Sequence, residues 1–373
     1  MRGTARLLFE LEMPMLTLAM FVGGLIALVA GAELLVRGAS RMALALGIAP
    51  LVVGLTIVAF GTSAPEVAVS VGAVLQGQTQ MAIGNVVGSN IFNVLFILGL
   101  SALITPLAVH LQVIRQEVPI LIGSSVLLLV LSLDGTVGLF DGALLLGLLL
   151  AYTVFLIVQS RSAGSDTNDY DREAPAPGGW DARLPVQIAM IVAGLALLVL
   201  GAQWLVDAAV VFARALGVSE LVIGLTIVAA GTSMPEVATS VMAAIKGERD
   251  IAVGNVVGSC TFNILGCLGL SGMVAGAQGV PVPPALLAFD LWVMLATTLA
   301  CLPIFLSGRE IARWEGLVFL GYYAAYVAYL ILAAQQHATL PAFSSAMLGF
   351  VIPLTLVTLV VSLIRRPAGT GPG

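Results

Sequence analysis

The chain has 373 residues, of which 60% are hydrophobic and 9% charged, and its mean hydropathy is +1.09. Soluble domains carry about 25% charged residues, so this composition excludes an ordinary water-soluble protein. The apolar runs are long and do not alternate, which excludes an outer-membrane barrel. The net charge of −5 indicates no nucleic-acid partner. The composition predicts an all-α polytopic protein embedded in a lipid bilayer.

Eleven membrane-spanning helices are predicted from apolar runs bounded by polar residues, proline or glycine. They fall at residues 15–40, 50–76, 81–105, 118–133, 136–158, 186–213, 219–245, 251–275, 285–306, 314–334 and 343–364. Arg2 and Arg6 precede the first run as in a secretion signal, but the run is too long for a signal core. We therefore expect it to be retained as the first membrane helix.

The two halves of the chain are copies of one another. Residues 54–100 align without a gap on residues 224–270, at an offset of 170, with 30 identities in 47 positions. Five predicted crossings separate the copies, an odd number, so they face opposite sides of the membrane. This predicts two inverted five-helix repeats, the architecture of secondary transporters, plus one extra C-terminal helix. The expected units are residues 1–159, a Ser/Asp/Pro/Gly-rich cytoplasmic linker at 160–185, a second repeat at 186–336, and the extra helix and tail at 337–373.

Basic residues predict the orientation. Twelve of the fifteen Lys and Arg residues fall on the side that receives the linker and the C-terminus, and only Arg2, Arg6 and Arg214 fall on the other. By the positive-inside rule, the linker and C-terminus are expected in the cytoplasm and the N-terminus outside. The expected location is a bacterial inner membrane or a plasma membrane.

Each repeat carries the motif GTSxPE in the middle of an apolar span, ending at Glu66 and Glu236. Proline removes a backbone hydrogen bond, so each span is predicted to break there and to free the carbonyls of Gly61 and Gly231. Non-helical backbone at this depth is tolerated where it lines a polar cavity, and freed carbonyls bind hard cations. A charge at the bilayer centre costs at least ~2.5–3.5 kcal/mol, so two repeated carboxylates indicate a site. If the turn stays near-helical, the hydroxyls of Thr62 and Ser63 share the face of Glu66.

A second motif, GNVVGSxxFN, follows in each repeat. Asn85, Ser89 and Asn93 lie four residues apart and form one polar stripe with neutral oxygen ligands. The glycines at 84 and 88 form a small-xxx-small pattern that permits close helix packing. Their copies at 254–263 repeat the pattern.

Other polar groups in the spans are given structural interpretations. Glu33 aligns with Gln203, and Asp141, Asp207 and Asp290 lie nearer helix ends. None of these residues shares a repeated acidic partner. His110 and His337 fall in short connections, and Cys260, Cys267 and Cys301 lie in apolar runs. No dinucleotide fingerprint, phosphate-binding loop or zinc-protease motif is present, so neither an enzyme nor a bound cofactor is expected.

The duplicated GTSxPE and GNVVGSxxFN segments resemble the alpha repeats of the calcium/cation antiporter superfamily, and the chain is similar to prokaryotic sodium/calcium exchangers. The resemblance implies a midplane site that binds Ca²⁺ and Na⁺, with Glu66 and Glu236 as central ligands. It implies further oxygen ligands from hydroxyls, amides and backbone carbonyls, namely Thr62, Ser63, Thr232, Ser233, Ser89, Asn93, Ser259, Asn263, Ala59 and Ala229.

One departure bears on the mechanism, because several relatives carry aspartate at the position of Asn263. This leaves two carboxylates in the site and leaves potassium dependence and stoichiometry open. Calcium takes six to eight oxygens, and the same oxygens can be divided among sodium ions, so occupancy by the two ions is mutually exclusive. Such occupancy of one alternately exposed site is the physical basis of antiport, and the family resemblance implies that Na⁺ is exchanged for Ca²⁺. A proton-coupled calcium exchanger stays open as an alternative, and a passive cation channel is less favoured because one deep site suits a carrier.

Overall fold

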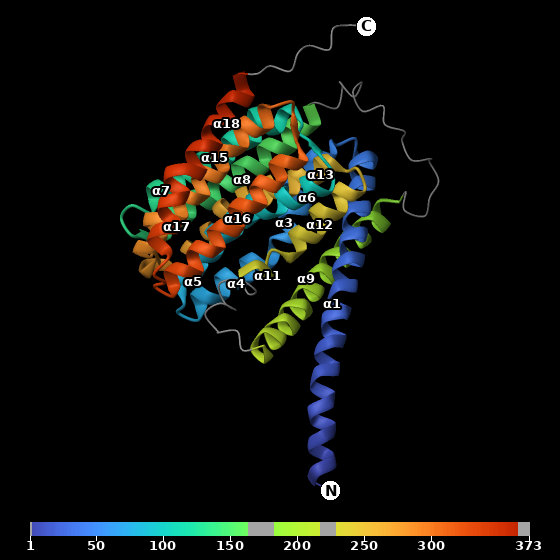
Figure 1. Cartoon of the computed structure of the whole chain (residues 1–373). Helices are drawn as coiled ribbons and strands as arrows, with labels where there is room; N and C mark the ends of the chain where they lie inside the picture. Colours follow the sequence, from blue (N-terminus) through green and yellow to red (C-terminus); the bar gives the residue numbers. More distant parts are fainter. Residues whose placement is uncertain (1, 163–182, 217–228, 365–373) are drawn as a thin grey trace.

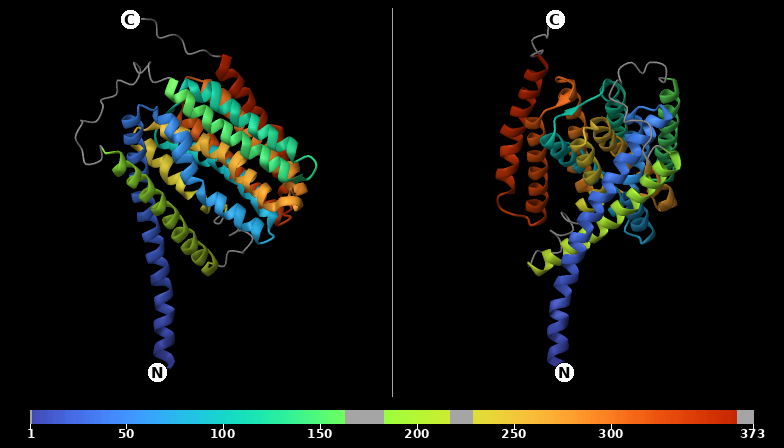
Figure 2. Two further views of the ribbon diagram at one scale, coloured as in Figure 1. Left: turned by 180° about the vertical axis from the view of Figure 1, so that it is seen from behind. Right: turned by 90° about the vertical axis from the view of Figure 1, so that its right-hand side faces the viewer.

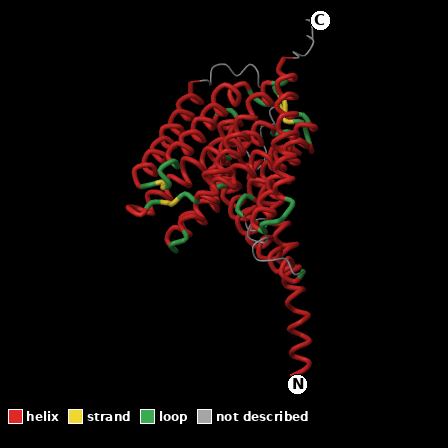
Figure 3. The backbone as a smooth tube through the Cα atoms, turned by 60° about the vertical axis from the view of Figure 1, so that its left-hand side comes forward, coloured by secondary structure: helices red, strands yellow, loops and turns green. Residues whose placement is uncertain are grey.

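Almost all of the described chain is helical, as Figure 3 shows. The structure is a computed structural model that describes residues 2–162, 183–216 and 229–364. In the first half, the helices are α1 (Arg2–Leu46), α2 (Pro50–Val53), α3 (Ala59–Thr62), α4 (Ala64–Leu75), α5 (Thr79–Phe92), α6 (Gly99–Ile104), α7 (Val118–Leu131) and α8 (Leu139–Ser162). In the second half, they are α9 (Leu184–Ala215), α11 (Ala229–Gly231), α12 (Met234–Ile245), α13 (Arg249–Phe262), α14 (Gly269–Ala275), α15 (Leu291–Leu306), α16 (Arg313–Ala334), α17 (Leu340–Ala346) and α18 (Ile352–Ile364).

Several spans contain a wider π-helical turn. These segments are η1 (Gly54–Val58), η2 (Asn93–Leu98), η3 (Val113–Glu117), η7 (Asn263–Leu268), η9 (Leu286–Asp290) and η10 (Met347–Val351). Such turns recur at functional sites because they redirect side chains without ending the helix. Two of them, η2 and η7, begin at Asn93 and Asn263, the last residues of the repeated polar stripe.

The predicted membrane-spanning architecture is confirmed. Within the described ranges, nine helices are long and apolar enough to cross a bilayer, and a bent pair, Pro50–Thr62 and Ala64–Leu75, makes a tenth candidate. These ten match ten of the predicted spans. The remaining prediction, residues 219–245, lies partly outside the described residues, which resume at α11 and continue into the short apolar helix α12.

The break predicted at GTSxPE lies at Ser63, where the helix axis bends by 41°. Ser63 adopts φ −82° and ψ 5°, and Pro65 falls in the first turn of α4, where its missing N–H costs no hydrogen bond. The second repeat has the same geometry at Ser233, with φ −89° and ψ 10°, before Pro235 in α12. The repeated proline therefore starts a new helix at the same position of each motif.

Two short antiparallel strand pairs provide evidence that the two repeats are inverted. β1 (Leu107–Ala108) pairs with β4 (Glu310–Ile311), and β2 (Thr136–Val137) pairs with β3 (Val280–Pro281). β1 and β3 occupy equivalent places in the two repeats, yet they belong to different sheets. Equivalent loops thus lie at opposite ends of the bundle, as two inverted repeats require.

The first helices of the two halves, α1 and α9, lie side by side along one flank of the molecule (Figures 1 and 2). Their backbones approach so closely that a Cβ added to Gly24 would lie 2.8 Å from the carbonyl oxygen of Gly201, and one added to Gly194 would lie 2.8 Å from that of Gly31. The offset of 170 converts one contact into the other. The pair therefore packs symmetrically, through small residues as membrane helices commonly do.

The centre of the molecule is formed by α5 and α13 with their π-helical continuations, which are the most buried spans. The helices α16, α17 and α18 lie at the flank opposite α1 (Figure 2, right). Most described residues of α17 and α18 are exposed, whereas most residues of α16 are half-buried. Gly254 and Gly258 of α13 pack against α2 and η1, as the small-residue pattern predicted. The equivalent contact of Gly84 and Gly88 would involve residues 221–229, most of which lie outside the described ranges, and stays a prediction.

Candidate ion-binding site

The two repeated carboxylates lie in the first turns of the helices that follow the breaks, Glu66 in α4 and Glu236 in α12. Both side chains are completely buried. A helix N-terminus presents free N–H groups and a partial positive charge, which stabilises a nearby carboxylate. The proline that breaks each span therefore also creates the local environment in which a carboxylate is tolerated at membrane depth.

Each carboxylate accepts a hydrogen bond from the serine of the opposite repeat. Ser63 Oγ donates to Oε1 of Glu236 at 3.0 Å, and Ser233 Oγ donates to Oε1 of Glu66 at 2.8 Å. Thr62 and Ser63 were expected to share the face of Glu66 only if the turn stayed near-helical. The helix is instead interrupted at Ser63, between α3 and α4, and the Ser63 hydroxyl bonds the carboxylate of the other repeat.

Two asparagines connect the repeats around these two serine–carboxylate hydrogen bonds. Asn85 donates through Nδ2 to Ser70 Oγ at 3.0 Å and accepts through Oδ1 from Thr232 at 3.4 Å. Its copy Asn255 donates to Ser240 Oγ at 2.9 Å and accepts from Thr62 at 3.0 Å. Each amide thus fixes a helix of its own repeat while it orients a threonine of the other.

The other predicted ligands lie around the same centre. Ser89 contacts Ser233 at 3.3 Å, and Ser259 contacts Thr62 at 3.4 Å, between hydroxyl oxygens in both cases. Asn93 and Asn263 are buried at the starts of η2 and η7. Asn263 Oδ1 accepts the Cys267 thiol at 3.7 Å.

The backbone ligands implied by the resemblance lie just before the breaks. The Ala59 carbonyl accepts hydrogen bonds from the Ser63 N–H at 3.0 Å and from the Thr62 hydroxyl at 3.4 Å. Ala229 begins α11, the equivalent segment of the second repeat.

Several buried oxygens at this centre make no hydrogen bond to the described parts of the chain. They include Oε2 of Glu66, Oε2 of Glu236 and Oδ1 of Asn93. Buried polar atoms are almost always satisfied, and orphaned carboxylate oxygens are the most costly exceptions. Hard cations bind carboxylate, amide and hydroxyl oxygens, so this set is chemically suited to hold Ca²⁺ or Na⁺.

The sequence analysis missed a repeated pair of acidic residues, because the two members of the pair are not separated by the 170 residues that separate the motifs. Glu117, at the end of η3, is buried and accepts the Tyr152 hydroxyl at 2.6 Å. Asp290, at the end of η9, accepts the Tyr326 hydroxyl at 2.8 Å. The equivalent strands β1 and β3 are 173 positions apart, because the second half carries three extra residues before β3. Asp290 therefore does have an acidic counterpart, contrary to the sequence analysis, and an alignment that allowed a gap would have found it.

The fold and this centre define a class of protein: a helical membrane transporter of inverted repeats with a buried carboxylate pair between them. Residues 16–158 and 186–332 match the family model for the sodium/calcium exchanger protein. The chain is 35% identical to the sodium/calcium exchanger MaX1 of Methanosarcina acetivorans over 339 residues, covering 82% of this chain and 96% of the relative. It is 37% identical to the inner membrane protein YrbG of Escherichia coli over 290 residues, covering 76% and 87% respectively.

Solved structures of the sodium-calcium exchanger NCX_Mj are similar over most of the chain. One of them, from crystals soaked without Na⁺ and Ca²⁺, has a TM-score of 0.72 and 29% identity, and covers 85% of this chain and 99% of that one. The chain belongs to the sodium/calcium exchanger family. It is a multi-pass membrane protein in a family of ion exchangers. This confirms the calcium/cation antiporter superfamily that the sequence motifs indicated.

Proposed function

We propose that this protein exchanges Ca²⁺ for Na⁺ at one buried site between the repeats, opened alternately to the two sides of the membrane. The central ligands are Glu66 and Glu236. The remaining oxygens come from the repeated motifs: Thr62, Ser63, Thr232, Ser233, Ser89, Asn93, Ser259 and Asn263, with the backbone carbonyls of Ala59 and Ala229. The observation that carries this proposal is the pair of reciprocal hydrogen bonds, from Ser63 to Glu236 and from Ser233 to Glu66. Among the described residues, the second oxygen of each carboxylate has no hydrogen-bond partner.

The charge balance favours exchange over simple permeation. Two ionised carboxylates match the charge of one Ca²⁺, and the same oxygens can be shared among monovalent ions that need fewer ligands each. With neither ion bound, the two charges would cross a low-dielectric barrier uncompensated, which is costly. The empty carrier therefore reorients slowly, and calcium release depends on a countercation.

The relatives support the choice of ions. MaX1 is named a sodium/calcium exchanger, and the NCX_Mj crystals were soaked with Na⁺, Ca²⁺ or Sr²⁺.

The working units are the repeats at 1–159 and 186–336, joined by a cytoplasmic linker at 160–185 and followed by the extra helix at 337–373. The distribution of Lys and Arg favours an orientation with the linker and C-terminus in the cytoplasm and the N-terminus outside.

Flux from vesicles that contain the purified protein and are loaded with Ca²⁺ tests this proposal. External Na⁺ should accelerate calcium release and saturate, whereas external K⁺ or Li⁺ should act less well. If an inward proton gradient replaced Na⁺ completely, the protein would be a proton-coupled exchanger. Fast, voltage-driven release that does not saturate and needs no external cation would identify a channel.

A further inference from the structure

A hydrogen bond between a tyrosine and a carboxylate joins the fourth and fifth membrane helices of each repeat. In the first repeat, Tyr152 of α8 donates to Oε2 of Glu117 at 2.6 Å. In the second, Tyr326 of α16 donates to Oδ1 of Asp290 at 2.8 Å. Each acid is the last residue of a π-helical turn, η3 or η9. The proposed ion exchange uses neither of these two tyrosine–carboxylate bonds, yet both repeats contain one.

The first of these bonds belongs to a larger buried network. Oε1 of Glu117 accepts the side-chain amides of Gln112 at 3.0 Å and Gln116 at 2.8 Å. Gln116 also exchanges two hydrogen bonds with Gln159 of α8. The Glu117 side chain is completely buried, and a buried carboxylate is costly unless hydrogen bonds satisfy it. Loss of the Tyr152 hydroxyl would therefore leave Oε2 without its partner and weaken the attachment of α8 to η3.

The two fifth helices, α8 and α16, each pack closely against the other repeat. A Cβ added to Gly142 of α8 would lie 2.6 Å from the carbonyl oxygen of Gly269 in α14. One added to Gly316 of α16 would lie 2.6 Å from the carbonyl oxygen of Gly99 in α6. Close-packed interiors transmit displacements from one helix to the next. Because α14 continues η7 and α6 continues η2, each fifth helix lies against the helix that carries a proposed asparagine ligand of the opposite repeat.

Side chains three residues before each tyrosine contact the π-helical turns that begin with these asparagines. Leu149 of α8 packs against η7, where a Cβ added to Gly266 would lie 2.9 Å from Leu149 Cδ2. The Tyr323 ring of α16 packs against Phe92 and Phe96, with ring centroids 5.2 and 5.4 Å apart. Gly266 and Phe96 each lie three residues after the asparagine of their own repeat. The position of each fifth helix therefore determines the surroundings of the asparagine in the other repeat.

We propose that the two tyrosine–carboxylate bonds position ligands of the ion-binding site, each in the repeat to which it does not belong. The first bond fixes α8 against η3 and so positions Asn263. The second bond fixes α16 against η9 and so positions Asn93. The inference rests on the proposed function, in which both asparagines are ligands, and it adds positioning residues that lie outside the site.

Double-mutant cycles test this assignment, with calcium titrated calorimetrically into the purified full-length protein. Tyr152→Phe removes only the hydroxyl and should weaken calcium affinity about fivefold, less than the roughly 10–100-fold typical of residues that bond a metal ligand directly. It should have no further effect in the Asn263→Ala background, but its full effect in the Asn93→Ala background. Tyr326→Phe should show the reverse pattern. A general loss of stability would act equally in both backgrounds, so the pattern separates positioning from a purely structural role.

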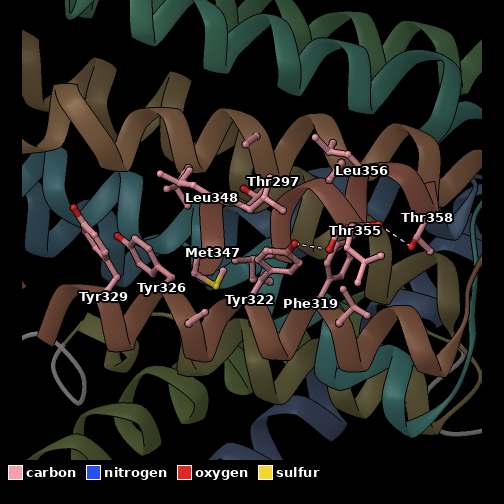
Figure 4. Close-up of a pocket in the computed structure, with 18 of the residues that line it drawn as sticks. Thr297, Phe319, Tyr322, Tyr326, Tyr329, Met347, Leu348, Thr355, Leu356 and Thr358 are labelled. Atoms are coloured by element: carbon pink, nitrogen blue, oxygen red, sulfur yellow. Dashed lines mark hydrogen bonds between the residues drawn. The ribbon is translucent and has the colours of Figure 1, made fainter. Parts of the chain in front are cut away.

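Two control variants remove a hydroxyl near each tyrosine but leave its bond to the carboxylate in place. Tyr322, one turn earlier on α16, donates to Thr355 of α18 at 2.6 Å (Figure 4). Thr153 of α8 donates to the Leu149 carbonyl of its own helix at 2.8 Å. Tyr322→Phe and Thr153→Val should therefore leave calcium affinity unchanged.

The outcomes distinguish a failure of the positioning role from a failure of the ligand set. Both carboxylates remain in the asparagine variants, so calcium binding stays measurable in each background. If the asparagine variants weaken binding but the tyrosine variants act equally in both backgrounds, the positioning role is overturned and the proposed function stands. Losses in the control variants as large as those in the tyrosine variants would overturn it as well. Unchanged calcium affinity in Asn93→Ala and Asn263→Ala would overturn the ligand set together with the positioning role.

Discussion

At the scale of single residues, the two halves of the site depend on one another. Ser63 hydrogen-bonds to Glu236 and Ser233 to Glu66, so neither motif supplies the whole environment of its own carboxylate. A substitution of the serine in one motif therefore disturbs the carboxylate of the other motif. This reciprocity provides a direct reason for both copies of GTSxPE to keep the serine.

We predict that Glu66→Gln and Glu236→Gln each lose calcium exchange almost completely while the protein still folds. The amide keeps the size of the side chain but removes half of the negative charge, and calcium affinity depends on the number of charged ligands. Calcium uptake into sodium-loaded vesicles, with size-exclusion behaviour as the folding control, measures the effect. Near-normal uptake by either variant would show that the carboxylates are not the central ligands.

The asparagines that connect the repeats should act by positioning. Asn85→Ala removes the bonds to Ser70 and Thr232, and we expect the apparent calcium affinity to fall about tenfold, the scale of one or two lost buried hydrogen bonds. Asn90→Ala is the control, because Asn90 Nδ2 donates to the Val86 carbonyl of its own helix, at 2.7 Å, and to no other group in the described ranges. Equal losses in calcium titrations of the two variants would refute a specific role for Asn85.

At the scale of helices, the symmetric packing of α1 against α9 is the feature most sensitive to side-chain volume. The α1–α9 pair touches the rest of the molecule mainly through α12 and the segments before the breaks, whereas its internal contact is backbone against backbone. Close packing of this kind leaves no room for a methyl group, and overpacking is as damaging as a cavity.

Gly31→Ala should therefore destabilise the protein by ~1–3 kcal/mol, the usual cost of an overpacked contact. The new Cβ would lie 2.8 Å from the Gly194 carbonyl oxygen and 2.9 Å from the Leu198 nitrogen. Gly147→Ala, at an exposed position of α8 with no described atom within 4 Å, is the matched control. Thermal unfolding in detergent compares the two, and equal midpoints would contradict the packing account.

At the scale of the whole molecule, the repeats are equivalent in their site but not at its periphery. Lys246, at the end of α12, forms an ion pair with Glu33 of α1. The residues at the equivalent positions, Gln76 and Gln203, carry no charge. Under the proposed alternating access, the two repeats would exchange conformations to give the opposite-facing state. We therefore expect the ion pair in only one of the two states.

We predict that Lys246→Gln shifts the equilibrium between the two states about two- to fivefold, the range expected for a partly exposed ion pair. Distances between spin labels on α1 and α12 would measure the populations. Installing the pair at the equivalent position, with Gln76→Lys and Gln203→Glu together, should shift the balance in the opposite direction to the native pair. Unchanged distance distributions in both variants would show that the ion pair does not select a state.

The sequence by itself determined the architecture, because the evidence for it is local or repeated. Apolar length predicts the spans, the proline of GTSxPE predicts the breaks, and the ungapped match of residues 54–100 to 224–270 with an odd number of crossings predicts the inversion. The chemistry of the two motifs also indicated which side chains to consider. Each of these inferences uses residues close together in the chain or a comparison of one segment with another.

Only the tertiary structure decided which residues meet. Ser63 is three positions from Glu66 in the sequence but bonds Glu236, because the packing of the two repeats brings the end of α3 against α12. Glu117 and Asp290 became equivalent only when their helices and tyrosine partners were in place. The hydrogen bond from Tyr322 of α16 to Thr355 likewise depends on where α18 packs (Figure 4). Contacts between distant segments follow from the packing of whole helices about the pseudo-twofold axis, and neither hydropathy nor spacing along the chain specifies that packing.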